Sequence, residues 1–566
     1  MDDFTARLTS DGIVEAASGE PVAVGSLRIR HRGYVCGGAA PAVLAAAYER
    51  WGGDLAAHVD GQYAAAIHDV ASGKVTLVHD DFGVVPLFYA AVGGDVTFGS
   101  DLGDVVARTG IGELDDRYLS HVLVHGLVPP GLTPYAHIRR LLPAEHATWS
   151  AGTLRTRQRK LAHRVEPFRG DDRELSERFR AVVAEAVAAA IPPEANTWCE
   201  LSGGLDSSTI VAFAAGCLGR SVEAMSWVHP RAPLADETRW MRVVTDAYPI
   251  PWHTFDGDSD PPYSDLPEGF LAEPTPQAVM RTGTQQRLGE HLRERGVDLV
   301  ITGNGGDAVL FGDHPPPTYL ADLVRRLRLL RLWRECRRWA DASRERRAPT
   351  YYLLRYGVRL AREPAQGYGP PPGTASAPWL SERVAGAAEG TPWPPHPAIP
   401  RDAGVADGLY LDSVLASADM LAGGARGRTT GVPERHPLLH RPLVDLMRSV
   451  PWERKLAPDR DRVVQRAALA DILPAATLAR DDKSRPTQVF TESFGTAREW
   501  HARLTERPLM AERGLVDADR WREAIAKARL GGGSSRHFIA AMAVEIWLQQ
   551  LRHAPSPTPD RSVSVP

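Results

Sequence analysis

The chain has 566 residues, of which 43% are hydrophobic and 24% are charged, and its formal net charge is −4. This length exceeds that of one compact domain, so we expect two or three domains with separate hydrophobic cores. The small negative charge excludes the broad basic field of proteins that bind nucleic acid over much of their surface, so no nucleic acid partner is expected.

Neither the N-terminal residues nor any apolar run predicts export or a membrane span. The first thirty residues carry acidic side chains where a secretory signal needs basic ones. No apolar run reaches the roughly 18–20 residues that cross a bilayer. The four cysteines lack the CxxC spacing of zinc sites and disulfide frameworks. These features indicate a reduced, cytoplasmic enzyme without an integral membrane segment.

Alternating apolar and polar residues, separated by glycine turns, predict a β-rich region over about the first 165 residues. Strands are predicted at Val75–Asp80, Pro86–Val92 and Asp95–Ser100. From about Glu174 onward, helices and strands alternate and glycines follow the strands. This order predicts a parallel α/β sheet that binds its ligand at the carboxyl ends of the strands.

The stretch LSGGLDSS (Leu201–Ser208) joins a predicted strand to a predicted helix. Its two glycines allow backbone N–H groups to approach phosphate oxygens, and a helix beginning near Ser207 would present its positive end to them. Asp206 would repel a phosphate, so its carboxylate is expected to bind Mg²⁺ instead. The alternative is an ordinary turn with serine N-caps. The hydroxyl groups available to a phosphate are those of Ser202, Ser207 and Ser208.

A second glycine loop, TGNGGD (Thr302–Asp307), follows the apolar residues DLVI. Asp206 and Asp307 would lie at the ends of adjacent strands and hold Mg²⁺ on two sides of a triphosphate. The alternative is a simple turn with an exposed aspartate.

An arginine-rich segment comes after the second loop. LVRRLRLLRLWRECRRW (323–339) predicts one amphipathic helix, and ten arginines lie between Arg325 and Arg347. Either these arginines form a solvated or salt-bridged face, or the segment 323–347 docks an acidic peptide or an accessory protein. The Pro/Ser-rich residues 553–566 predict a disordered tail.

The chain resembles the pyrophosphatase-loop synthetase domain of the asparagine synthetase class B family in three motifs. These are SGGLDSS, the downstream pair Asp236–Glu237, and GNGGD. DDFGVVPLFY, ending at Tyr89, is similar to the family's RD-x-x-G-x-x-PLYY element. The resemblance covers about residues 1–550. It implies an α+β, Ntn-hydrolase-like (glutaminase-type) sandwich at 1–168 and an α/β parallel-sheet ATP-pyrophosphatase domain at 172–552.

The family's chemistry implies ATP and Mg²⁺ as cofactors, activation of a carboxylate as an acyl-adenylate, and release of AMP and pyrophosphate. Lys483 resembles the family's essential lysine, whose ammonium would stabilise negative charge in both transition states. The alternative is a solvated surface lysine. The resemblance implies that ATP is bound by Leu201, Ser202, Gly203, Gly204, Leu205, Asp206, Ser207, Ser208, Ser226, Gly303, Gly305 and Gly306, with Asp206 and Asp307 as metal ligands.

Departures from the family narrow the choice of amine. A working glutaminase domain has an N-terminal cysteine nucleophile, whereas the second residue here is Asp2 and the nearest cysteine is Cys36. Glutamine hydrolysis is therefore not expected, and the domain is interpreted as a scaffold. β-Lactam synthetases carry a catalytic tyrosine where this chain has Asn304, which cannot act as a general base. Gly427 and Arg428 stand about where their partner glutamate lies.

These departures favour a likeness to the lasso peptide cyclases, or macrolactam synthetases. Such an enzyme adenylates an Asp or Glu side chain of a ribosomal core peptide and closes an isopeptide ring with the peptide's N-terminal amine. The candidate catalytic residues are Lys483, Asn304 and Glu434, the last being the nearest possible base, with a capping or surface role as its alternative. A leader peptidase and a leader-recognition protein are the implied partners. A small-molecule amide or β-lactam synthetase, an ammonia-dependent asparagine synthetase and a non-catalytic peptide-binding scaffold remain open.

Overall fold

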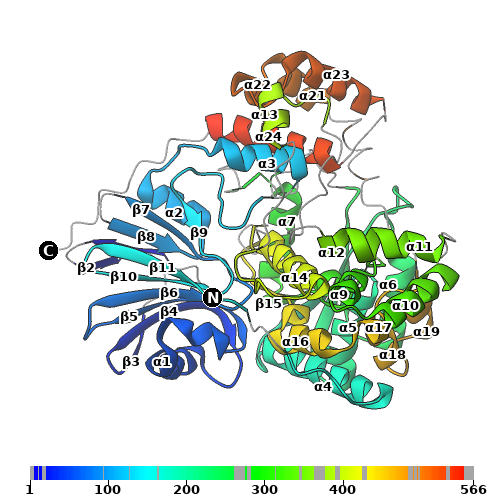
Figure 1. The fold of residues 1–566 in the computed structure, drawn as a ribbon. Helices are drawn as coiled ribbons and strands as arrows, with labels where there is room; N and C mark the ends of the chain where they lie inside the picture. Colours follow the sequence, from blue (N-terminus) through cyan, green and yellow to red (C-terminus); the bar gives the residue numbers. More distant parts are fainter. Residues whose placement is uncertain are drawn as a thin grey trace.

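The computed structural model describes residues 5–9, 12–15, 21–92, 95–126, 128–161, 165–259, 275–276, 279, 282–312, 314–342, 347–362, 377–388, 396–423, 430–481, 489, 494, 498–530 and 536–553. They form a β-rich N-terminal part followed by a larger α/β part (Figure 1). The described residues do not include Asp2, Gly427, Arg428, Lys483 or the tail from residue 554. Among the described helices, none is long and apolar enough to cross a membrane.

Two antiparallel sheets make up the N-terminal part, with the strand orders β2-β1-β8-β7-β9 and β11-β10-β6-β5-β4-β3. The predicted strands are confirmed as β6, β7 and β8, with ends shifted by one or two residues. The strands of the first sheet are β1 (Thr5–Thr9), β2 (Gly12–Glu15), β7 (Phe88–Val92), β8 (Asp95–Gly99) and β9 (Arg139–Arg140). Those of the second are β3 (Val22–Val24), β4 (Leu27–Val35), β5 (Gly61–Asp69), β6 (Lys74–His79), β10 (Glu145–Ser150) and β11 (Thr153–Gln158).

Strand β5 is buried on both faces, which explains its run of apolar residues. Ala64 and Ala66 belong to the core between the two sheets. Tyr63 and Ile67 point the other way, into the core beneath α1 (Ala40–Trp51). Because successive side chains of a strand alternate between its faces, one short sequence serves two cores.

The second part is built on a parallel sheet with the order β14-β13-β12-β15-β16. The chain runs outward from β12 to β13 and β14, then returns to place β15 on the other side of β12. The space beyond the ends of β12 and β15 is therefore a topological switch point, where such sheets bind ligands. An antiparallel two-sheet domain followed by a parallel α/β sheet confirms the expected fold class. The strands are β12 (Thr197–Glu200), β13 (Val222–Val228), β14 (Trp252–Asp256), β15 (Leu299–Ile301) and β16 (Glu434–Arg435), and the helices beside them include α4 (Asp172–Ala190), α5 (Leu205–Val211), α6 (Thr238–Ala247), α7 (Thr282–Glu294) and α16 (Arg441–Ser449).

The C-terminal helices return to the N-terminal part, as Figure 1 shows at the top of the molecule. Helix α24 (Arg536–His553) contacts α3 (Asp116–His125), and the rings of Tyr135 and Trp547 meet edge-on with centroids 6.3 Å apart. One hydrophobic core therefore contains residues from both ends of the chain. The other helices of this core are α2 (Leu102–Thr109), α13 (Glu382–Ala388), α21 (Arg498–Glu506), α22 (Leu509–Glu512) and α23 (Ala518–Arg529).

The arginine-rich segment is two helices, so the prediction of one continuous helix over 323–339 is wrong. Helix α9 (Tyr319–Arg325) ends before Leu327, which has a φ of 54°, and α10 (Leu329–Ala342) follows. The left-handed residue redirects the chain, so that Leu332 and Cys336 are buried while residues 325–331 are all exposed. The packing of α10 against the core, rather than helix propensity, decides where the helix breaks.

Gln62 joins the two parts through a buried pair of hydrogen bonds. Its side-chain amide donates to the carbonyl of His436 (2.7 Å) and its side-chain oxygen accepts from the backbone N–H of the same residue (3.1 Å). Gln62 is only 2% exposed. A side chain on β5 thus satisfies both backbone groups of a residue that directly follows β16.

We expect Gln62→Leu to destabilise this junction, because the buried backbone N–H of His436 loses its bond to the Gln62 side chain at a cost of about 1–3 kcal/mol. The carbonyl of His436 still accepts from the backbone N–H of Leu439 (2.9 Å). The measurements are the melting temperature and the rate of limited proteolysis. Gln549→Leu is the control, since Gln549 bonds within the C-terminal helices, to the carbonyl of Arg507 (3.2 Å) and to Glu545 (2.7 Å). Equal effects of both substitutions would contradict a special role for the junction.

Candidate active site

Two glycine loops meet at the switch point. The first loop (Leu201–Ser208) follows β12, and the second loop (Thr302–Asp307) follows β15. A Cβ atom on Gly303 would lie 2.6 Å from the backbone nitrogen of Ser207. The second loop therefore rests directly on the backbone of the first, which only a residue without a side chain permits.

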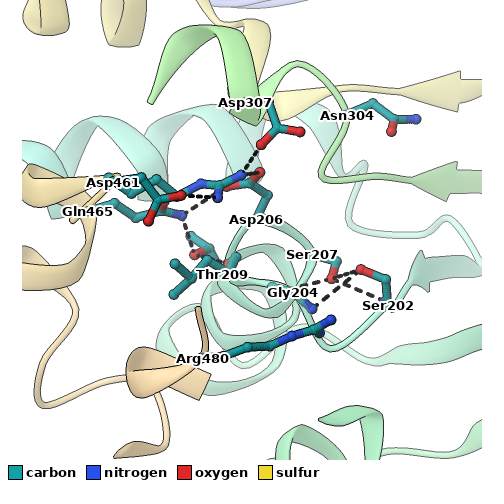
Figure 2. Close-up of polar contacts among 12 residues, drawn as sticks. Ser202, Gly204, Asp206, Ser207, Thr209, Asn304, Asp307, Asp461, Gln465 and Arg480 are labelled. Atoms are coloured by element: carbon teal, nitrogen blue, oxygen red, sulfur yellow. Dashed lines mark hydrogen bonds and ion pairs between the residues drawn. The ribbon is translucent and has the colours of Figure 1, made fainter. Parts of the chain in front are cut away.

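The helix of the first loop begins earlier than expected, at Leu205 rather than near Ser207, with Gly204 as its N-cap residue. The Ser207 hydroxyl oxygen accepts from the backbone N–H of Ser202 (3.1 Å) and lies 3.1 Å from the Ser202 hydroxyl (Figure 2). Ser208 is completely buried beneath the loop. The two serines thus hold the first loop in shape at the N-terminus of α5. The free backbone N–H groups of a helix N-terminus are what an anion site requires.

Buried neighbours fix the beginning of the first loop. The Ser226 hydroxyl, on β13, donates to the carbonyl of Leu201 (2.6 Å) and accepts from the indole N–H of Trp252 (2.9 Å). A Cβ atom on Gly203, whose φ is +70°, would lie 2.5 Å from the carbonyl carbon of Trp240. The loop is therefore confined between β13 and α6. Leu201 and Leu205 are buried at 1% and 6% exposure and anchor the loop in the core.

Asp206 and Asp307 are brought together, and a cation that the sequence analysis did not identify lies between them. Arg462 contacts Asp206 through two nitrogens, at 3.1 Å and 2.6 Å, and also forms an ion pair with Asp307. Gln465 donates to Asp206 at 3.3 Å. Burial raises the pKa of Asp206, opposed by Arg462. Burial disfavours the charge on Arg462, but Asp206 and Asp307 outweigh it and raise the pKa of the guanidinium.

The two carboxylates fit a magnesium site that is completed by a nucleotide. Oxygens of Asp206 and Asp307 converge on the same nitrogen of Arg462, so both can reach one small cation. Within the described ranges, no group of three or more His, Cys, Asp or Glu residues could hold a metal. Mg²⁺ is commonly held by one or two carboxylates together with substrate phosphates and water. The donor set therefore suits Mg²⁺ bound with ATP.

The second loop depends on a relay from the N-terminal part. The Thr302 hydroxyl accepts from the backbone N–H of Asn304 (3.1 Å) and lies 2.8 Å from Nδ1 of His436, the residue that Gln62 binds. Figure 2 shows the Asn304 side chain turned away from Asp206. Glu434 lies on the edge strand β16 opposite Val300 and is half-buried. His436, two residues beyond the candidate base, thus reaches the loop through its ring, and the carbonyl of Arg435 accepts from the backbone N–H of Thr302 (3.0 Å).

The chain leading to Lys483 is held beside the first loop by Arg480. Its guanidinium forms an ion pair with Glu237 and lies 5.2 Å from the centroid of the Trp240 ring, on the helix that confines Gly203. Arg466 donates to the carbonyl of Arg480 (3.0 Å). Glu237, quoted above only as part of a motif, thus positions this segment. Lys483 itself remains a prediction.

Behind the second loop lies a buried lysine surrounded by aromatic rings. Lys455, at the end of α17 (Trp452–Lys455), is 1% exposed and donates to the carbonyl of Met447 (2.6 Å). Its ammonium nitrogen lies 3.8 Å from the Trp452 ring centroid and 5.4 Å from that of Phe311. Tyr410 stacks on Phe311 and belongs to this packing. Burial lowers the pKa of Lys455 to about 7.

We expect the lowered pKa of Lys455 to make the free energy of unfolding rise with pH. Between about pH 7 and its ordinary value of 10.5, the unfolded chain binds a proton that the folded chain does not. Stability relative to Lys455→Met should therefore rise with pH across this window, by up to about 1.4 kcal/mol per pH unit.

The check is the melting temperature of both proteins between pH 7 and pH 10. Lys527→Met, at a side chain that is 68% exposed, is the control and should show no such difference. A constant difference between wild type and Lys455→Met would contradict the lowered pKa.

Comparisons with known proteins agree with this geometry. Residues 178–549 match the asparagine synthase family, and residues 35–160 match the glutamine amidotransferase domain. "Asparagine synthetase [glutamine-hydrolyzing] 3" of Bacillus subtilis is 24% identical over 484 residues, covering 81% of this chain and 72% of that protein. A putative asparagine synthetase of Mycobacterium tuberculosis is 30% identical over 197 residues, covering 33% of this chain and 30% of its own length.

A solved glutamine phosphoribosylpyrophosphate amidotransferase from B. subtilis aligns with 53% of this chain and 75% of its own at 11% identity, with a TM-score of 0.18, which is too low to inform the fold further. The match over residues 178–549 contains both glycine loops, Arg462 and Arg480. The chain therefore belongs to the asparagine synthase family, whose members are ATP-dependent amide-forming ligases.

Proposed function

We propose that this protein is an ATP-dependent lasso peptide cyclase. It adenylates an Asp or Glu side chain of a ribosomal core peptide and joins the activated carbonyl to the peptide's own N-terminal amine, releasing AMP and pyrophosphate. Family membership supports the activation of a carboxylate. The source of the amine needs separate support.

The raised pKa values of the cysteine thiols are the observation that supports the proposal. Burial raises the pKa of Cys36 and Cys336 to about 11 and that of Cys199 to about 12, and it also raises the pKa of Cys217. Nearby Asp60 raises the pKa of Cys36 further. A cysteine that attacks glutamine needs the opposite shift. Ammonia made by a thiolate of this chain is therefore not supported. An amine already present on the substrate and free ammonia remain as nucleophiles, and the proposal takes the first.

The chain's own residues supply binding, orientation and charge to this reaction. The first loop and the start of α5 hold the phosphates, and Asp206 and Asp307 hold Mg²⁺, which when bound would neutralise phosphate charge. Lys483 stabilises the oxyanion formed when the amine attacks. An N-terminal amine has a pKa of about 7.7–8.0, so a useful fraction is neutral at physiological pH. Asn304 therefore needs only to orient groups, and catalysis rests on positioning.

Pyrophosphate release with different acceptors tests the proposal. The purified chain with ATP and Mg²⁺ is given linear peptides that have a free N-terminal amine and one internal Asp or Glu. Controls receive aspartate with ammonium, or aspartate with glutamine. We expect pyrophosphate only with peptides, together with a product lighter by one water. Activity with aspartate and none with peptides would exclude the cyclase.

Variants test the roles within the site. Asp206→Asn and Lys483→Met should each lower turnover by about 10² or more, because each removes charge stabilisation of the transition state. Asp471→Asn and Lys527→Met change exposed residues, at 67% and 68% exposure, and serve as matched controls. Full activity of Asp206→Asn would refute the nucleotide site.

We also propose that the corner between α9 and α10 docks an acidic accessory partner, such as the leader-recognition protein or the leader peptidase. Leu327 and Leu330 are 79% and 92% exposed, amid arginines. Among the described residues, Arg331 pairs with Glu453 (2.5 Å), whereas Arg326 and Arg328 have no carboxylate partner. Exposed leucines near Arg326 and Arg328 suit an acidic surface with apolar side chains.

The double variant Arg328→Glu, Leu330→Ser should separate docking from catalysis. We expect it to cyclise a leader-free core peptide normally, yet to lose at least about 10-fold in product, the equivalent of about 1.4 kcal/mol of binding, when the full precursor is supplied with the accessory proteins. Leu530→Ser, at an 89% exposed leucine elsewhere, is the control. Equal product from the full precursor would refute the docking surface.

A further inference from the structure

Arg462 occupies the space between the two candidate metal ligands in a way that demands explanation. The residue is 6% exposed and directly precedes α18 (Val463–Ala468). Its φ of +50° is a backbone conformation that arginine rarely adopts. Its backbone N–H donates to the carbonyl of Phe311 (3.2 Å), four residues beyond Asp307. The fold therefore holds the Arg462 backbone beside the second loop.

The guanidinium stands where a shared metal would have to bind. One nitrogen, Nη2, contacts oxygens of both Asp206 and Asp307, while Nη1 contacts Asp461 at 3.2 Å. Mg²⁺ binds carboxylate oxygens at about 2.0–2.1 Å, so an ion shared by these two carboxylates would overlap Nη2. The arginine and the metal cannot occupy this position together.

The backbone around the second loop packs against both aspartates and against the arginine, since a Cβ atom on Gly312 would also lie 3.0 Å from Nη2 of Arg462. A Cβ atom on Gly306 would collide with the Asp206 carboxyl, and one on Gly312 would collide with the Asp307 carboxyl. Gln465 also binds Asp206 (3.3 Å) while donating to Thr209 (3.0 Å). Both carboxylates are thus packed against backbone. Asp307 is 55% exposed, which leaves an open side from which a metal–nucleotide complex can arrive.

We propose that Arg462 is a resident counter-cation that exchanges with the metal. In the absence of nucleotide, it neutralises Asp206 and Asp307 and keeps the site in shape. When Mg²⁺ arrives with ATP, the guanidinium withdraws from both carboxylates, keeps its contact with Asp461 and turns its freed N–H groups toward the incoming phosphates. The exchange prevents divalent ions from filling the site without a nucleotide. This inference rests on the nucleotide site of the proposed function, but not on peptide cyclisation.

Manganese binding to the nucleotide-free protein tests the exchange. Mn²⁺ substitutes for Mg²⁺ as the probe, and its affinity is measured by electron paramagnetic resonance and calorimetry on the full chain. We expect wild type to bind Mn²⁺ weakly, and Arg462→Gln to bind one Mn²⁺ at least 10-fold more tightly. Arg462→Lys keeps the charge but loses the fork that spans both carboxylates, so it should give an intermediate affinity.

The controls separate exchange from general disruption. Arg448→Gln removes a buried arginine that pairs with Asp407 (2.9 Å) away from the site, and it should leave Mn²⁺ affinity unchanged. Adding Asp206→Asn to Arg462→Gln should abolish the gain. Unchanged or weaker Mn²⁺ binding by a folded Arg462→Gln or Arg462→Lys protein would overturn the proposal. No peptide or turnover is involved, so failure of the cyclase proposal would leave this measurement intact.

Discussion

The close approach of two backbones at the switch point is the constraint on which the rest of the site depends. Gly303 lies against the backbone of Ser207, and Gly306 lies against the carboxyl of Asp206. Any side chain at either position would push the second loop away from the first. The separation of Asp206 from Asp307, and so their ability to share a cation, follows from these two glycines.

Bringing two carboxylates together creates an electrostatic problem that the fold must solve in every state. Two like charges at short range in a partly dry environment disfavour each other's ionisation. A nearby positive charge is therefore needed whether or not a metal is present. Arg462 meets this need from a segment 256 residues away from Asp206, and Arg466 in turn holds Asp461 beside it at 2.8 Å. The positive charge that the two carboxylates need is thus brought to them by the tertiary fold and not by their neighbours in the sequence.

The sequence predicts the parts of the site that are local and leaves out those that are distant. Both glycine loops, the strands before them and the parallel sheet follow from short motifs and from the order of elements. Arg462 and Gln465 were missed because nothing in DRDRVVQRA indicates which carboxylates they meet, although two acidic residues alternating with two arginines are a signal of a paired cluster. The break at Leu327 was missed because periodicity cannot distinguish one helix from two that both pack against the core.

The same contrast applies to the N-terminal part, whose match to the glutamine amidotransferase domain over residues 35–160 does not indicate its contact with the second loop. Gln62 satisfies both backbone groups of His436, whose ring contacts Thr302, and Thr302 accepts from the backbone of Asn304. The conformation of the second loop is therefore linked through three hydrogen-bonded residues to strand β5.

A second connection runs through the core that α24 shares with α3. Removing the N-terminal part would expose Trp547, which is now completely buried, together with the apolar residues around it. Burial of this kind is the main stabilising term in folding, and its loss would fall on the synthetase helices themselves. Neither the relay to Asn304 nor the shared core uses a thiol. The physical reasons for keeping this part of the chain are therefore independent of glutamine hydrolysis.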